Sequence, residues 1–121
     1  MRKPWLWLLA IFASASVAAA DPRQLAVELS GMKPLAATHL ATTLALSPDV
    51  ERRTTIARAL EWEFPLFGDA AILEHLAGDE SPAIRASCAR AAWIRRATGD
   101  VLARLAVDPD PEVRSVATRG G

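Results

Sequence analysis

Two stretches of the chain repeat almost the same phrase, and this repetition constrains the fold more than any other feature. Residues 79–87 read DESPAIRAS and residues 108–115 read DPDPEVRS, 29 positions later. In each phrase a polar residue that caps helices well stands directly before a proline, which is well tolerated as the first residue of a helix. The repetition therefore predicts that the same turn into a helix is built twice.

The same signal occurs four times along the chain, with an apolar pattern of helical period after each one. The dipeptides are Asp21-Pro22, Ser47-Pro48, Ser81-Pro82 and Asp110-Pro111, and their prolines are 26, 34 and 29 residues apart. A start signal that recurs about every 30 residues is typical of an internal helical repeat. We expect helices over 22–30, 34–46, 48–62, 70–77, 82–97, 100–107 and 111–119, and no segment alternates as a strand would. The predicted fold class is all-α.

A shift of 29 residues superposes the last two units. It places Leu73 on Leu102, Leu76 on Leu105, Asp79 on Asp108, Pro82 on Pro111 and Arg85 on Arg114. One helical hairpin cannot bury its own apolar stripe, so such units stack on their neighbours. Small residues on the helix over 82–97 would let neighbouring helices approach closely.

The stretch GDVLARLAVDPDPEVRSVATRG, residues 99–120, resembles a short HEAT repeat of the type also found in phycobilisome-lyase-like proteins. The resemblance is specific over 68–121, moderate over 47–67 and weak over 21–46. It implies a right-handed α-solenoid of three to four stacked antiparallel helix pairs, an armadillo-type superhelix.

The resemblance also implies a structural ladder in which a turn aspartate pairs with an arginine of a neighbouring unit. The matching residues are Asp79 and Arg85 in one unit, and Asp108 and Arg114 in the next. An alignment on the prolines places Glu51 at the arginine position of the preceding unit and Ala45 at its aspartate position. We therefore expect the ladder to join only the last two units.

The first twenty residues have the layout of a secretory signal peptide. Arg2 and Lys3 precede an apolar run, and a small-residue stretch ends at Ala20, which predicts cleavage before Asp21. The expected product is a single domain, residues 21–121, that is exported to the periplasm or secreted and has no contact with the membrane. If residues 1–20 are retained, the alternative is a membrane-tethered scaffold.

Charge and residue types exclude several function classes. Without Arg2 and Lys3, 12 of the 14 basic residues remain against 14 acidic ones, so the chain lacks the basic footprint of a nucleic-acid binder. Two histidines and one cysteine provide no metal-ligand spacing and no catalytic set. We expect no metal, no cofactor and no enzymatic activity; by analogy of fold alone, a lyase-like or cofactor-handling enzyme is the alternative.

The stretch EWEFPLFGD, residues 61–69, is the candidate for partner binding. Trp62, Phe64 and Phe67 either fold back into the core or form an exposed aromatic anchor for a protein partner. Further candidates are the side chains of the second helices, which line the concave surface that the resemblance implies: His39, Thr43, His75 and Arg104. The final helix from Pro111 either caps the stack or leaves an open face for a partner or a second copy.

Three further features have ordinary structural interpretations. Cys88 is expected to be a buried thiol that packs as a small apolar group. Trp93 is expected in the core or half-buried. Arg95 and Arg96 are expected to be a solvated pair that complements the dipole at a helix C-terminus.

Overall fold

The computed structural model describes residues 21–96 and 100–120, so the predicted signal peptide lies outside the described residues. Within these ranges the chain forms seven α-helices and no strand, which confirms the all-α prediction. The helices are α2 (Pro22–Ser30), α3 (Pro34–Ala45), α4 (Val50–Ala59), α5 (Asp69–Ala77), α6 (Pro82–Ile94), α7 (Val101–Leu105) and α8 (Pro111–Arg119).

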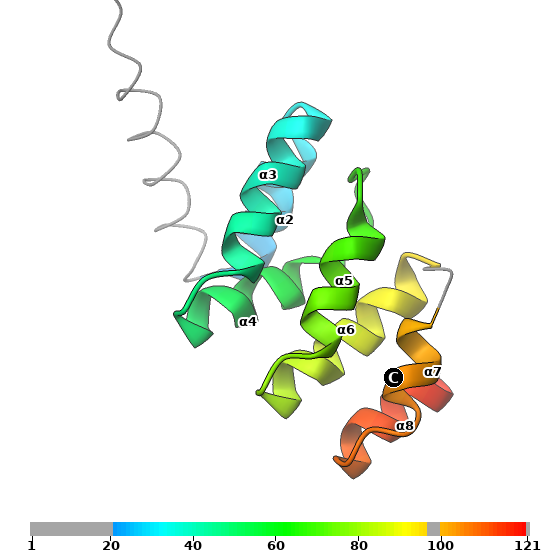
Figure 1. Ribbon diagram of the computed structural model, residues 1–121. Helices are drawn as coiled ribbons and strands as arrows, with labels where there is room; N and C mark the ends of the chain where they lie inside the picture. Colours follow the sequence, from blue (N-terminus) through cyan, green and yellow to red (C-terminus); the bar gives the residue numbers. More distant parts are fainter. Residues whose placement is uncertain (1–20, 97–99, 121) are drawn as a thin grey trace, which may run out of the picture.

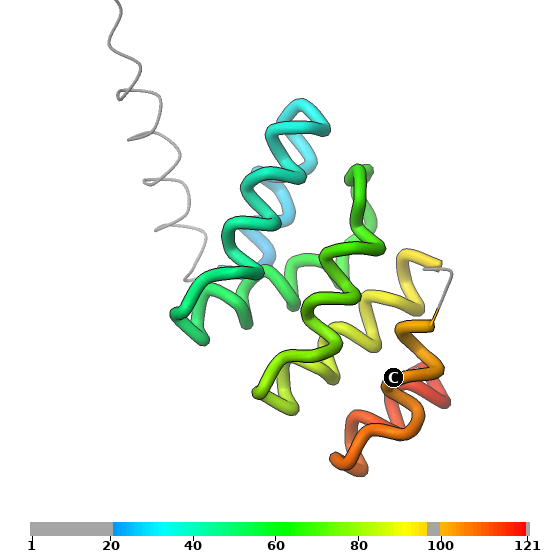
Figure 2. Tube along the Cα trace, in the orientation of Figure 1, coloured from blue at the N-terminus to red at the C-terminus, as the bar shows by residue number. Residues whose placement is uncertain are grey.

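The helices lie in two layers (Figure 1). Helices α2, α4, α6 and α8 pack consecutively against one another in one layer, and α3, α5 and α7 do the same in the other. Helices α3, α5 and α7 each lead by a short turn into the next helix of the first layer and pack against it. The tube in Figure 2 follows this alternation from one layer to the other along the whole described chain.

Capping residues begin three of the described helices as predicted. The side chains of Asp21, Ser81 and Asp110 accept bonds from backbone N–H groups of α2, α6 and α8, and a proline opens each of these helices. Such caps satisfy donors that have no partner within the helix. The capping signals therefore located three helix starts correctly.

Helix α4 begins differently from the prediction. Its cap is Asp49, which accepts the N–H of Glu51, while the Ser47 hydroxyl accepts the N–H of Asp49. Pro48 thus lies ahead of the helix rather than at its first position, because the carboxylate of Asp49 takes over the capping role. The helix also ends at Ala59 instead of residue 62.

Small and aliphatic side chains fill the space between the layers. The small residues of α6 are buried as expected, and they let α4 and α8 approach it from either side. The largest fully buried side chains come from all seven described helices and from the residue after α4: Leu25, Leu29, Leu44, Ile56, Leu60, Leu73, Leu76, Ile84, Leu105 and Val113. Burial of these side chains is the main stabilising term of a domain that has no disulfide.

Candidate functional site

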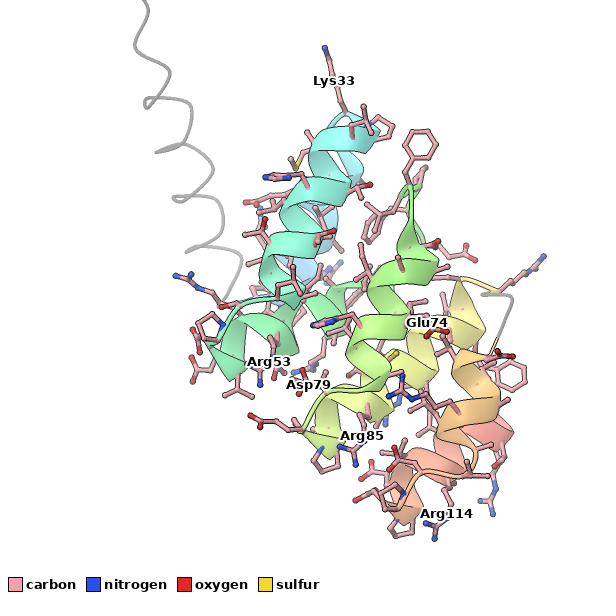
Figure 3. All side chains as sticks on the ribbon, viewed as in Figure 1. Lys33, Arg53, Glu74, Asp79, Arg85 and Arg114 are labelled. Carbon is pink, nitrogen blue, oxygen red and sulfur yellow. The ribbon has the colours of Figure 1, made fainter. Side chains whose placement is uncertain are left out.

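A row of arginine–aspartate pairs follows the turns that connect the two layers. Arg53 Nε lies 2.8 Å from Asp79 Oδ2, and Arg85 Nε lies 2.8 Å from Asp108 Oδ2. A second bond, from Arg85 Nη2 to Asp108 Oδ1 at 3.1 Å, makes the latter pair bidentate. Figure 3 shows Arg53, Asp79, Arg85 and Arg114 along the same edge of the molecule. The ladder therefore ties α4 to the turn before α6, and α6 to the turn before α8.

The prediction that the ladder joins only the last two units is wrong, because the alignment on prolines displaced the earlier unit by two residues. The position equivalent to Ser81 and Asp110 is the capping Asp49, not Ser47. With Asp49 as reference, Arg53 occupies the position of Arg85, four residues after the cap. In both pairs the aspartate accepts from the arginine of the preceding unit.

The Arg85–Asp108 pair is partly withdrawn from solvent. Burial would raise the pKa of Asp108, but the bonds from Arg85 and from the Asp110 N–H outweigh it and hold that pKa below its ordinary value. The same side-chain bond raises the pKa of Arg85 against the opposing effect of burial. Both groups are therefore charged at neutral pH, and the pair is a structural contact with no group poised for proton transfer.

The structure separates the three aromatic side chains of residues 61–69. Phe64 is buried against the core, whereas Trp62 is 44% exposed and Phe67 is 61% exposed. Only Phe64 thus folds back into the core; the anchor role stays a prediction for Trp62 and Phe67. Phe64 fills space beside α6, and the two exposed rings remain available to a partner.

Arg95 holds this linker in place. Its guanidinium donates to the backbone carbonyls of Leu60, Trp62 and Phe64 at 3.3, 2.9 and 2.6 Å. It also pairs with Asp69 at 3.1 Å, and its Cζ lies 4.6 Å from the centre of the Phe64 ring. The side chain is only 4% exposed. The expectation of a solvated arginine is therefore wrong for Arg95, whose donors are used by the linker; Arg96 is exposed.

A groove runs between α3 and α5. It encloses about 240 Å³ and is lined by Thr38, Thr42, Ala45, Leu46, Gly68, Ala71, Ile72 and His75. Helices α3 and α5 pack against each other and run in the same direction (Figure 1). At the N-terminal end of the groove the Thr38 hydroxyl donates to the Phe67 carbonyl at 2.7 Å, which fixes the backbone that carries the exposed Phe67 ring.

The candidate residues of the second helices are placed on the α3–α5–α7 layer, and all of them are exposed. His75 lines the groove, whereas His39 and Thr43 lie on α3 outside its lining. Arg104 lies against the end of α5, where its Nη1 is 3.5 Å from the Glu74 carbonyl. Of the candidate residues, His75 lines the groove, and Phe67 directly precedes the lining residue Gly68.

The α3–α5–α7 layer is poor in charge. Its helices contain only Asp69, Glu74 and Arg104 as charged residues, whereas α4 alone contains four. Exposed apolar side chains occur at both ends of the layer, with Leu35 in the first turn of α3, Leu46 directly after α3 and Val107 after α7. Depletion of charge with exposed aromatic and aliphatic side chains is typical of the core of a protein–protein interface.

Cys88 and Trp93 have structural roles. The Cys88 thiol is fully buried and lies 3.1 Å from the Leu73 carbonyl, and burial raises its pKa to about 12. A thiol that stays protonated is a poor nucleophile. Trp93 is 44% exposed, as Trp62 is, but its ring N–H donates to the carbonyls of Val116 and Ala117 at the end of α8.

Within residues 21–96 and 100–120, no cluster of three or more His, Cys, Asp and Glu side chains is arranged to hold a metal ion. None of the helices described is long and apolar enough to cross a membrane. Comparison of the chain with models of protein families, with curated proteins and with solved structures gave no match.

Proposed function

We propose that this protein is an exported, non-enzymatic module that binds another protein through its α3–α5–α7 layer. The proposed architecture is a right-handed HEAT-like α-solenoid, supported by the repeated turn, by the two layers of consecutively packed helices and by the parallel course of α3 and α5. Export rests on the pattern of residues 1–20.

The observation that carries the proposal is the groove between α3 and α5 with Phe67 beside it. The groove is largely apolar, lies in the layer that is poor in charge, and has a rigid floor because both helices are held by the buried core. A preformed surface loses little conformational entropy when a partner binds. The exposed rings of Phe67 and Trp62 supply the large apolar contacts that dominate binding energy in interfaces.

The proposal is tested by blocking the groove without disturbing the core. Ala71 is exposed and lines the groove, so Ala71→Phe should fill it. Ala83 is also exposed and lies on α6 in the opposite layer, which makes Ala83→Phe the matched control. Partners captured from a periplasmic or culture extract should be lost with Ala71→Phe and with Phe67→Ala, and retained with Ala83→Phe.

Circular dichroism of all three variants should match the unsubstituted protein, because none of the changed side chains is buried. If Ala71→Phe and Ala83→Phe capture the same set of proteins, the groove is not the binding surface. If Phe67→Ala lowers helicity, the ring belongs to the fold and the anchor is excluded.

A further inference from the structure

The α3–α5–α7 layer contains two junctions between neighbouring helices, and the sequence makes these junctions equivalent. Helices α3 and α5 end at the cap residues Leu46 and Gly78. The shift of 29 residues that superposes the last two units places His75 of α5 on Arg104 of α7. Arg104 lies against the end of α5, and His75 lines the groove beside the end of α3, so the two side chains occupy equivalent places.

At the α5–α7 junction, Arg104 reaches across to the end of α5. Its Nη1 lies 3.5 Å from the Glu74 carbonyl oxygen, and a Cβ added to Gly78 would lie 2.9 Å from its Nη2. The glycine at the end of α5 therefore leaves room for the guanidinium group. A cation at this place also lies at the negative end of the α5 dipole. The C-terminal end of a helix in this layer thus receives a guanidinium from a neighbouring segment.

At the α3–α5 junction, the equivalent place is open. His75 is shorter than arginine, and the groove of about 240 Å³ remains between the two helices, with Leu46 in its lining where α5 has Gly78. The last turn of α3 contains no basic residue. Arg53 and Arg85 donate to the turns after α3 and after α5 in the same way, so they do not account for the difference. The end of α3 therefore lacks the guanidinium that the end of α5 receives.

Two polar groups that line this groove are unused by the fold. The hydroxyls of Thr38 and Thr43 donate to the carbonyls four residues earlier, at 2.9 and 2.8 Å. The Thr42 hydroxyl and the His75 ring, in contrast, form no hydrogen bond with the described residues. The shift of 32 residues that superposes Leu46 on Gly78 also places Thr42 on Glu74, the residue whose carbonyl faces Arg104. A hydroxyl oxygen and the unprotonated nitrogen of a neutral imidazole both accept hydrogen bonds.

We propose that the α3–α5 groove binds an arginine side chain of the partner protein. This inference rests on the proposed function, because it names the partner chemistry of the same groove. The apolar stem of the arginine lies along the small side chains of the groove, and its guanidinium donates to Thr42 and His75 at the end of α3, as the stem and head of Arg104 do at the end of α5. An apolar side chain would leave both polar groups unpaired.

The charges on the two helices favour a cation over a carboxylate in the groove. Helix α3 contains no charged residue, and the charged residues of α5 are Asp69 and Glu74, which are both acidic. The negative end of the α3 dipole acts in the same direction. A carboxylate in the groove would therefore meet only repulsion from these groups, whereas a guanidinium is attracted by them.

The test uses a labelled peptide of residues 101–107, VLARLAV, blocked at both ends, and a matched peptide that carries Arg104→Gln. By fluorescence anisotropy, the full chain should bind the arginine peptide at least about tenfold more tightly than the glutamine peptide. His75→Arg supplies the guanidinium from the chain itself and should remove this preference. His39→Arg is the matched control, because it adds the same charge on α3 outside the lining of the groove, and it should retain the preference.

A second pair of variants tests the acceptor in the groove. Thr42→Val removes the unused hydroxyl and should reduce the preference for the arginine peptide. Thr43→Val makes the same change at the next residue, where the hydroxyl is bonded to its own helix, and should retain it. Circular dichroism of all four variants should match the unsubstituted protein, because none of the changed side chains is buried.

The inference is overturned if His75→Arg keeps the preference, or if the arginine peptide fails to bind at about 1 mM. If the two peptides bind equally and Ala71→Phe abolishes the binding of both, the groove takes apolar side chains; the inference then fails and the proposed function stands. If Ala71→Phe leaves both the peptide binding and the partner capture unchanged, the proposed function fails together with the inference.

Discussion

The two ends of helix α5 are fastened by arginines in different ways. After α5, the turn at Asp79 is held by Arg53, and the same arrangement recurs one unit later between Arg85 and Asp108. Before α5, the linker of residues 60–69 is held by a bond from Thr38 to the Phe67 carbonyl and by Arg95, which reaches three carbonyls, one carboxylate and one ring. One edge of the molecule thus repeats a modest contact, and the other concentrates several contacts on a single side chain.

This difference between the two ends of α5 determines how much stability is lost when one arginine is removed. Each ladder pair can be lost while the other still fastens its own turn. In the linker, Arg95 makes four polar contacts and Thr38 makes one, and the Arg95 side chain is more deeply buried than either ladder arginine. Breaking Arg95 should therefore cost more than breaking any one ladder pair.

The largest effect is expected for Arg95→Ala. It leaves three carbonyls without their donor and removes the partner of Asp69, and we expect a loss of about 4 kcal/mol in the free energy of unfolding. Urea unfolding followed by circular dichroism measures it. The control is Arg96→Gly, which should cost little or stabilise slightly, because Arg96 has a positive φ of 51° that glycine adopts readily. If Arg95→Ala lowered the free energy of unfolding by less than Arg85→Ala does, the linker contact would contribute less to stability than a ladder pair.

A smaller loss is expected for Arg85→Ala, about 3 kcal/mol, because the buried Asp108 keeps one bond from its own turn but loses its charged partner. The same measurement on Arg53→Ala should give a smaller value, since Arg53 makes one bond to Asp79 where Arg85 makes two to Asp108. The control is Arg90→Ala, on α6 like Arg85, because Arg90 has only a loose 3.7 Å contact with Glu112. Equal losses for Arg85→Ala and Arg90→Ala would exclude the ladder as a stabilising contact.

The smallest effect is expected for Asp108→Asn at neutral pH, about 1.5 kcal/mol, because asparagine keeps part of the bonding but loses the charge. Since the pKa of Asp108 is lowered in the folded protein, its contribution is fully present above the pKa of the unfolded chain and is lost as the pH falls through the folded value. The difference in the free energy of unfolding between the unsubstituted protein and Asp108→Asn should thus narrow as the pH falls below about 4. A gap that is constant from neutral to acidic pH would mean that the carboxylate charge is not the source of the effect.

Helix positions were predictable from the sequence because their signals are local. A capping side chain followed by proline identified the starts of α2, α6 and α8, and apolar periodicity identified the second helices. The start of α4 was misplaced since Ser47 and Asp49 both suit a cap, and the proline after the first drew the alignment to it. That two-residue error concealed Arg53, although the spacing of four from Asp49 would have revealed it.

The Arg95 contact was not predictable, for a physical reason. Most of its partners are backbone carbonyls, which have no signature in side-chain sequence, and the linker is not repeated elsewhere in the chain. For the same reason nothing in EWEFPLFGD distinguished the buried Phe64 from the exposed Phe67, because the stretch has neither helical nor strand period. The sequence could place the candidate residues on the second helices, α3, α5 and α7. It could not predict the groove between α3 and α5, because the groove is lined by side chains from two helices that are brought together only by folding.

The consecutive packing of the helices has a consequence for how the molecule opens. Substantial contacts join only helices that are adjacent in the stack, so no helix at the α2 end is locked by one at the α8 end. In arrays of this kind, stability is close to a sum of neighbouring interfaces, and opening starts at the termini. Amide hydrogens of α2 and α8 should therefore exchange with solvent before those of α6, which is covered from both sides, and a partner bound at either extremity would slow the exchange there first.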